Sequence, residues 1–172
     1  MKKPWPGCEM TAHGVFHVTT SSPEETEALG RRLAPMVPPG TVVGLYGDLA
    51  SGKTCFVRGF AGYFDVGGAV HSPTFTLINR YCADPALYHV DLYRLDGVEE
   101  VLDLGIEELF ESAAVCLVEW AERAGDALPT VHVKARFAHA GPTSRHVTIE
   151  DYGALPEGWD SVLNQLRPDV TR

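Results

Sequence analysis

The sequence lacks the features that mark secreted, zinc-scaffolded and membrane-spanning proteins. No C-x-x-C pair and no histidine at metal-ligand spacing occurs. No apolar run approaches the roughly 18–20 residues that a membrane span needs. After Met1-Lys2-Lys3 the chain continues with Pro4-Trp5-Pro6-Gly7, where a signal peptide would have an apolar core. These absences predict a cytoplasmic protein without a membrane segment, whose cysteines stay reduced. The cysteines are scattered: Cys8, Cys55, Cys82 and Cys116. Of these, Cys55 and Cys116 are expected to be small buried hydrophobic residues.

Basic residues are also scarce: the chain has 14 Lys and Arg against 23 Asp and Glu, which gives a formal charge of −9. A broad nucleic-acid footprint needs a basic surface. We therefore expect any nucleic acid to be held by a partner and to meet this chain only indirectly. A length of 172 residues suits one well-packed domain. The first dozen residues are rich in Pro and Gly, so we expect a flexible arm over 1–12 and a single domain over 13–172.

The most informative segment is G-D-L-A-S-G-K-T, which begins at Gly47 and matches the phosphate-binding pattern G-x-x-x-x-G-K-[ST]. Its two glycines permit a tight turn with N–H groups directed at phosphates. Lys53 is expected to reach the β- and γ-phosphates of a nucleotide, and the Thr54 hydroxyl to hold Mg²⁺. Residues 41–46 predict a buried strand before this loop, and residues 53–64 a helix after it. The predicted nucleotide contacts are Asp48, Leu49, Ala50, Ser51, Gly52, Lys53, Thr54 and Cys55.

Hydrophobic periodicity and turn residues divide the rest of the chain into short elements. Helices are expected from Pro23 through Leu33, over 97–104 and 106–110, and from about 159 to 166. Strands are expected over 13–19, 72–81, 87–91, 114–118, 131–137 and 145–150, with the last two forming a hairpin. The pattern predicts an α/β fold, a P-loop NTPase-like three-layer sandwich whose mixed sheet has a parallel core and an antiparallel C-terminal hairpin.

Two acidic residues end apolar strands and are candidates for work at the phosphates. Glu119 follows a five-residue apolar run, where an acid holds a metal or orients water in nucleotide hydrolases. Alternatively, Glu119 only marks where the strand meets solvent. Its neighbour Trp120 is expected either to contact the nucleotide or a partner protein, or to pack as an ordinary residue of the core or rim. Asp91 ends another strand, and it either orients the attacking water or pairs with Arg94 as a surface salt bridge.

Ser72-Pro73-Thr74 lies one short loop beyond the phosphate-loop helix. Nucleoside triphosphatases often keep a γ-phosphate sensor there, and the Thr74 hydroxyl suits that role. A capped turn that opens a strand explains the same residues.

Four motifs in one order resemble the TsaE (YjeE) family, the bacterial ATPase of tRNA threonylcarbamoyladenosine biosynthesis. They are the phosphate loop, S-P-T-F-T-L from Ser72, H-V-D-L-Y-R-L from His89 and L-V-E-W-A-E from Leu117. The resemblance implies that Lys53 and Thr54 bind ATP and Mg²⁺ and that Glu119 is a further Mg²⁺ ligand. It also implies that Asp91 and Trp120 matter for activity. The implied partners are TsaB-like and TsaD-like proteins, which the ATPase resets as they modify adenosine 37 of tRNA.

The loop departs from the family pattern, which usually reads G-D-L-G-A-G-K-T-T. Ala50 replaces a glycine, so a positive φ there costs about 1–2 kcal/mol. Cys55 replaces a threonine whose hydroxyl could touch an α-phosphate. We therefore expect weakened nucleotide binding. Two other functions stay open: a nucleotide-dependent binding module with negligible turnover, and a P-loop small-molecule kinase.

Overall fold

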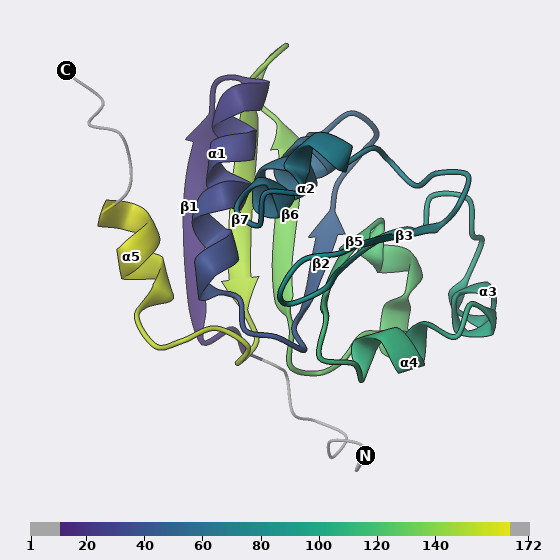
Figure 1. Ribbon diagram of the computed structural model, residues 1–172. Coiled ribbons are helices and arrows are strands. Elements are labelled where there is room, and N and C mark those ends of the chain that lie inside the picture. Colours follow the sequence, from purple (N-terminus) through teal and green to yellow (C-terminus); the bar gives the residue numbers. More distant parts are fainter. Residues whose placement is uncertain (1–10, 166–172) are drawn as a thin grey trace.

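The computed structural model describes residues 11–165, which fold around one seven-stranded sheet (Figure 1). The strand order is β1-β7-β6-β2-β5-β4-β3. Most of the predicted arm, residues 1–10, lies outside the described residues, as does the end of the predicted C-terminal helix. The strands are β1 (Gly14–Thr20), β2 (Val42–Tyr46), β3 (Ile78–Tyr81), β4 (Leu87–Asp91), β5 (Val115–Glu119), β6 (Val133–His139) and β7 (Arg145–Asp151).

The sheet combines a parallel centre with antiparallel edges. β2 pairs in parallel with both β5 and β6, and β4 pairs in parallel with β5. The pairs β3–β4, β6–β7 and β1–β7 are antiparallel. This topology confirms the predicted mixed sheet and its C-terminal hairpin. It also places the carboxyl ends of the central strands at one edge, where ligands of open α/β sheets bind.

Helices cover both faces of the sheet, which confirms the three-layer sandwich (Figure 1). One apolar cluster joins the sheet to α1 (Pro23–Leu33), α2 (Lys53–Gly62) and α5 (Trp159–Gln165). The other cluster joins the opposite face to α3 (Val98–Asp103) and α4 (Ile106–Phe110). Short 3-10 helices occur at η1 (Ala34–Met36), η2 (Gly67–Ala69), η3 (Ala121–Arg123) and η4 (Gly125–Ala127).

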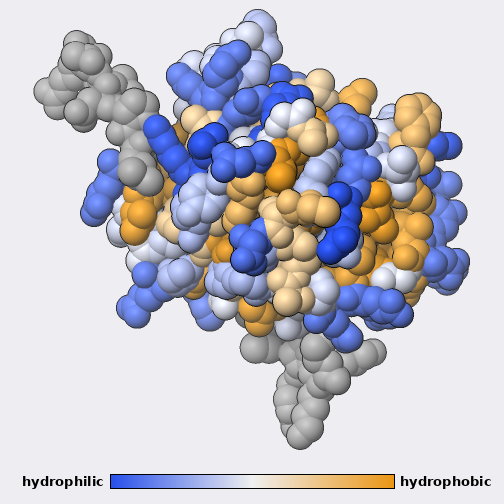
Figure 2. Space-filling model, viewed as in Figure 1, coloured by the Kyte–Doolittle hydropathy of each residue, from blue (hydrophilic) through white to orange (hydrophobic). Residues whose placement is uncertain are grey.

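The outer surface is mixed in character. On the face in view in Figure 2, hydrophilic and hydrophobic residues are interspersed, and the orange areas gather toward the side on which α3 lies. Among residues 11–165, every helix is too short or too polar to cross a bilayer.

Two glycines set the crossing of α1 over α2. A Cβ on Gly59 would lie 1.8 Å from the carbonyl oxygen of Glu27, and one on Gly30 would lie 2.2 Å from that of Phe56. Only a residue without a side chain permits such a close backbone approach. The crossing fixes the N-terminal turn of α1 beside that of α2, which follows the phosphate loop.

The predicted strand over 72–81 is too long, because only Ile78–Tyr81 pairs in the sheet. Before it, the Leu77 N–H donates to the Pro73 carbonyl at 2.6 Å, and Leu77 has a φ of 64°. The Asp91 N–H donates to the Leu77 carbonyl at 2.9 Å. Residues 72–77 therefore form a turn over the end of β4 rather than an extended strand.

Candidate nucleotide site

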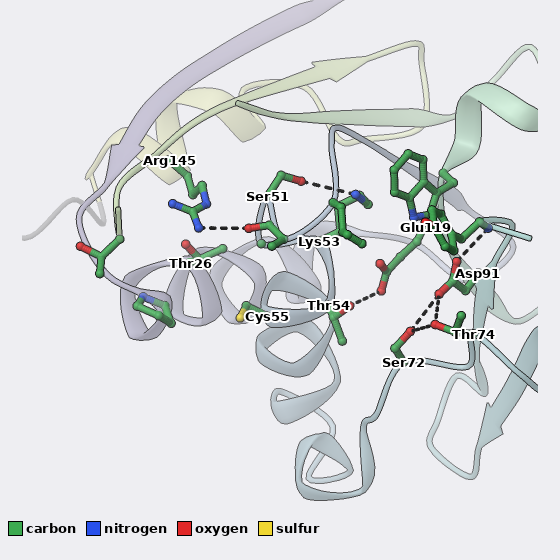
Figure 3. A pocket seen from close by; sticks show the side chains of 17 residues that line it. Thr26, Ser51, Lys53, Thr54, Cys55, Ser72, Thr74, Asp91, Glu119 and Arg145 are labelled. Carbon is green, nitrogen blue, oxygen red and sulfur yellow. Dashed lines mark hydrogen bonds between the residues drawn. The ribbon is translucent and has the colours of Figure 1, made fainter. Parts of the chain in front are cut away.

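A cavity of about 480 Å³ opens at the carboxyl ends of β2, β4 and β5 (Figure 3). Its volume falls within the range of roughly 300–1,000 Å³ that small-molecule sites occupy. The phosphate loop, the N-terminal turns of α1 and α2, the loop before β3 and the β6–β7 turn surround it. The lining residues are Pro23, Thr26, Leu49, Ala50, Ser51, Gly52, Lys53, Thr54, Cys55, Ser72, Thr74, Asp91, Tyr93, Glu119, Trp120, Thr143 and Arg145.

The phosphate loop connects β2 to α2 through three residues of positive φ. Gly47 has a φ of 141°, and a Cβ there would lie 2.4 Å from the Phe137 carbonyl oxygen. Gly52 has a φ of 105° and precedes the first residue of α2. Ala50 has a φ of 58°, so the strain expected from its Cβ is present. Asp48 is the one predicted nucleotide contact that does not line the cavity, and it lies in the exposed part of this loop.

Lys53 is buried, with 4% of its surface exposed, and lies under the loop that it follows. Its Nζ donates to the carbonyl oxygens of Gly47 at 2.6 Å and Asp48 at 2.8 Å. Burial lowers the pKa of this ammonium group, and the nearby Glu119 carboxylate acts in the opposite direction. A buried cation with neighbouring N–H groups of a helix terminus is suited to neutralise a phosphate.

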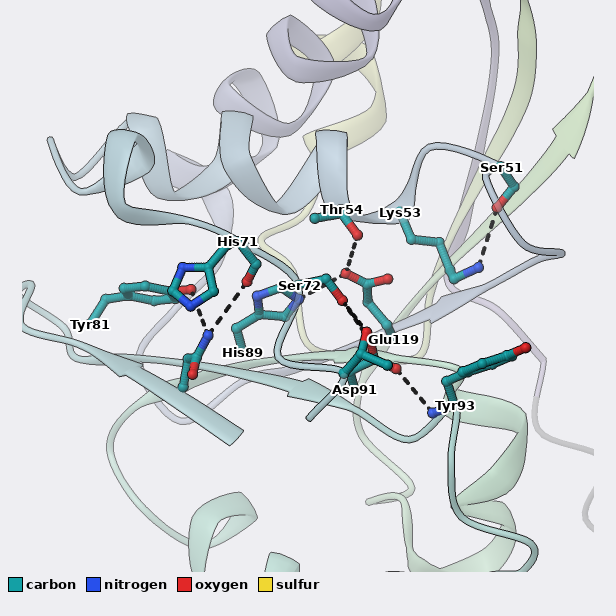
Figure 4. Close-up of polar contacts among 12 residues, drawn as sticks. Ser51, Lys53, Thr54, His71, Ser72, Tyr81, His89, Asp91, Tyr93 and Glu119 are labelled. Carbon is teal, nitrogen blue, oxygen red and sulfur yellow. Dashed lines mark hydrogen bonds and ion pairs between the residues drawn. The ribbon is translucent and has the colours of Figure 1, made fainter. Parts of the chain in front are cut away.

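Thr54 and Glu119 meet beside Lys53 (Figure 4). The Thr54 hydroxyl donates to Glu119 Oε1 at 2.8 Å, and His89 Nε2 lies 2.8 Å from the same oxygen. Glu119 is 4% exposed, so it does not simply mark where the strand meets solvent. The parallel register of β2 and β5 places it opposite Leu45, just before the phosphate loop.

Asp91 lies beside Glu119 because the two residues are register partners on β4 and β5. Its Oδ2 accepts hydrogen bonds from the hydroxyls of Ser72 at 2.8 Å and Thr74 at 2.9 Å, and its Oδ1 accepts from the Tyr93 N–H at 3.0 Å. The alternative salt bridge to Arg94 does not form, because the Arg94 guanidinium lies over the Phe75 ring, 5.5 Å from its centroid. Asp91 instead holds the turn over 72–77 at the cavity wall.

Trp120 directly follows the strand end that carries Glu119. It has a φ of 58°, which is unusual for a bulky residue and marks a constrained site. Lys53 Nζ lies 4.2 Å from the centroid of its ring, and the Tyr93 ring centroid lies 5.0 Å away. The indole therefore packs against the phosphate-loop lysine as well as against a neighbouring aromatic ring.

The structure also brings in residues that sequence reasoning missed. Pro23 and Thr26 reach the cavity from α1, and Thr143 and Arg145 reach it from the β6–β7 turn. Arg145 Nη2 donates to the Ala50 carbonyl at 3.0 Å, while Nη1 donates to the Ser144 carbonyl at 2.8 Å. Arg145 thereby ties the strained part of the phosphate loop to the hairpin. Its place at the start of the predicted 145–150 strand was the only sequence signal.

The two cysteines that were expected to be small buried residues differ. Cys116 is buried on β5, and burial raises the pKa of its thiol to about 12. Cys55 is only half-buried and lines the cavity, so the prediction was wrong for that residue. Its place in the first turn of α2 exposes it to the ligand side.

The residues present fit Mg²⁺ bound together with a phosphate. Mg²⁺ takes oxygen ligands at about 2.0–2.1 Å in octahedral geometry, so neighbouring ligand oxygens lie about 2.9 Å apart. Thr54 Oγ1 and Glu119 Oε1 are 2.8 Å apart, which matches that spacing. Among residues 11–165, no three His, Cys, Asp or Glu side chains cluster as a metal site. This donor set suits Mg²⁺, which usually takes one or two carboxylates and completes its shell with phosphate and water.

Comparison with known proteins gives consistent matches. A family model described as threonylcarbamoyl adenosine biosynthesis protein TsaE matches residues 20–147. The Bacillus subtilis tRNA threonylcarbamoyladenosine biosynthesis protein TsaE is 41% identical over 135 residues, which cover 78% of this chain and 84% of the relative. The Treponema pallidum protein of the same name is 37% identical over 128 residues, covering 74% and 95%.

A solved structure also matches. The crystal structure of Bacillus subtilis YdiB superimposes with a TM-score of 0.66 at 32% identity, covering 88% of this chain and 93% of YdiB. This likeness supports the predicted fold class, a P-loop type of α/β sandwich.

Proposed function

This chain belongs to the TsaE family of threonylcarbamoyl adenosine biosynthesis proteins, and we propose that it serves that pathway by binding ATP with Mg²⁺ and hydrolysing it. The observation that carries the proposal is the convergence of Lys53, Thr54 and Glu119 at one end of the cavity. Their ammonium, hydroxyl and carboxylate groups suit the phosphates of a nucleotide and the metal ion that accompanies them.

Hydrolysis moves the γ-phosphoryl group from ADP to water, and it requires positioning and charge neutralisation more than covalent chemistry. Lys53 and the N–H groups of the loop would neutralise the β- and γ-phosphates. Thr54 and Glu119 would hold Mg²⁺, which neutralises charge on the phosphates when bound. Asp91 would hold Thr74 and Ser72 at the same end, where hydroxyls could contact the γ-phosphate or the attacking water. Trp120 would keep the Lys53 ammonium facing this end.

We propose that TsaB-like and TsaD-like proteins are the partners and that tRNA meets the chain only through them. The family membership supports this assignment, because the relatives are named for biosynthesis of a modified tRNA nucleoside. The formal charge of −9 supports it as well, because such a surface disfavours direct contact with a phosphate backbone.

Calorimetric titration with ATP, in Mg²⁺ and in EDTA, tests the binding step. The unmodified protein should bind ATP more tightly in Mg²⁺. Thr54→Val keeps the shape of the side chain and removes the hydroxyl, and Glu119→Gln keeps the shape and removes the charge. Both should lose the gain from Mg²⁺ while keeping the affinity measured in EDTA. Equal affinity of the unmodified protein in Mg²⁺ and EDTA would overturn the proposed site, and GTP in place of ATP measures base preference.

Measuring phosphate release from ATP separates the proposed ATPase from a nucleotide-dependent binding module and from a P-loop small-molecule kinase. A binding module would show Mg²⁺-dependent binding without phosphate release, even beside its partners. A P-loop kinase would phosphorylate a small acceptor faster than it hydrolyses ATP. The kinase alternative is the weaker one, because the chain forms the β6–β7 hairpin where such kinases carry an arginine-rich lid, and because Arg145 already donates to main-chain carbonyls.

A further inference from the structure

His89 is a fully buried imidazole whose one polar contact in the described structure is with Glu119 (Figure 4). Its Nε2 lies 2.8 Å from Glu119 Oε1, and its Nδ1 has no hydrogen-bond partner among residues 11–165. Because Thr54 also donates to Oε1, this carboxylate acts as an acceptor and His89 Nε2 is the donor. His89 does not line the cavity, so it acts on a ligand only through Glu119.

Packing alone does not explain an imidazole at this position. His89 shares one face of the sheet with the fully buried Leu87 and with Leu117, its register partner on β5. An apolar side chain would fill this position without burying a ring nitrogen that lacks a partner, which is costly. The retained polar atom is the one that points at Glu119.

The two hydrogen bonds at Glu119 constrain the orientation of its carboxylate group. Thr54 and His89 both donate to Oε1, from the phosphate-loop helix and from β4 respectively. A carboxylate held by donors from two different elements has its rotation fixed before any cation arrives. Such outer partners orient metal ligands, and their loss typically lowers metal affinity by about 10–100-fold.

We propose that His89 is a positioning residue for Glu119, which fixes the carboxylate in the orientation that binds Mg²⁺ beside Thr54. This inference rests on the proposed function, since it assumes that Glu119 binds Mg²⁺ with ATP. It assigns His89 a role in metal affinity and none in contacting the nucleotide.

Two substitutions make a matched pair, because they differ in how far the amide reaches. The amide nitrogen of glutamine extends to about the place of the imidazole Nε2, so His89→Gln keeps the donor to Glu119. His89→Asn carries the same amide one carbon shorter and cannot reach. His89→Leu removes every donor and suits the apolar face, which provides a second measurement if the asparagine variant unfolds. Thermal unfolding of each variant confirms that it is folded.

The experiment is calorimetric titration of ATP in EDTA and at rising Mg²⁺ concentration. All variants should bind ATP equally in EDTA. His89→Asn and His89→Leu should need about 10–100-fold more Mg²⁺ for half of the gain in affinity, and His89→Gln should restore a requirement close to that of the unmodified protein.

Two results would overturn the role proposed for His89 and leave the proposed function standing. One is an unchanged Mg²⁺ requirement in the asparagine and leucine variants while Glu119→Gln loses the gain. The other is an equal loss of ATP affinity with and without Mg²⁺, which would indicate a general packing role. If the unmodified protein shows no gain from Mg²⁺, the proposed function itself fails.

Discussion

Ala50 occupies a left-handed backbone conformation in the phosphate loop, with a φ of 58°, and its methyl group is exposed. An L-residue other than glycine pays about 1–2 kcal/mol for that conformation. Glycine avoids this strain but loses about 0.5–1 kcal/mol more backbone entropy on folding. No buried contact is removed, and Arg145 still donates to the carbonyl of residue 50. Ala50→Gly should therefore raise the free energy of unfolding by about 0.5–1 kcal/mol.

For a chain of 172 residues, 1 kcal/mol shifts the melting temperature by about 2–4 °C, so Ala50→Gly should raise it by about 1–4 °C. Differential scanning calorimetry without nucleotide measures this shift. MgATP should bind at least as tightly, since the loop would keep its conformation with less strain.

Ala28→Gly is the matched control, because Ala28 lies in helix α1, where glycine costs about 1 kcal/mol. The two changes delete the same methyl group and should shift the melting temperature in opposite directions. A fall for Ala50→Gly as large as that for Ala28→Gly would refute the assignment of strain to the loop.

Further predictions concern the loop, the turn over β4 and alkaline stability. Gly47→Ala should abolish ATP binding in calorimetry and lower the melting temperature, because its Cβ would lie 2.4 Å from a β6 carbonyl oxygen. Asp91→Ala should free the Ser72 and Thr74 hydroxyls that donate to Asp91, so that limited proteolysis cleaves the turn over 72–77 faster than in the unmodified protein. Burial raises the pKa of the Cys116 thiol to about 12 and, with the nearby Glu122 charge, that of Tyr46 to about 12. Both groups stay protonated to a higher pH in the folded state than in the unfolded state, so the free energy of unfolding should fall from about pH 9 upward. Cys116→Ala should make this fall less steep in urea titrations at increasing pH.

The local parts of the site could be predicted from the sequence. The phosphate loop needs only a short segment with fixed glycines, and Glu119 and Asp91 end apolar strands whose parallel pairing brings their side chains to one edge. The apolar runs already indicate strands buried on both faces, which predicts their parallel pairing in the centre of the sheet.

The remaining parts depend on contacts between distant segments. Arg145 reaches the loop because β6 runs parallel to β2, so that the β6–β7 turn emerges at the phosphate edge. Residues 72–77 form a turn rather than a strand because Asp91 accepts their hydroxyls and donates its N–H to Leu77. His89 alternates within a strand like any inward residue, and only the finished sheet shows that it faces Glu119.

The most direct test of the central claim is phosphate release from ATP in the presence of the TsaB-like and TsaD-like proteins. The account predicts Mg²⁺-dependent release that rises when both partners are added to this protein and that is lost in Glu119→Ala. Release that stays at the level without partners, or that persists unchanged in Glu119→Ala, would contradict it.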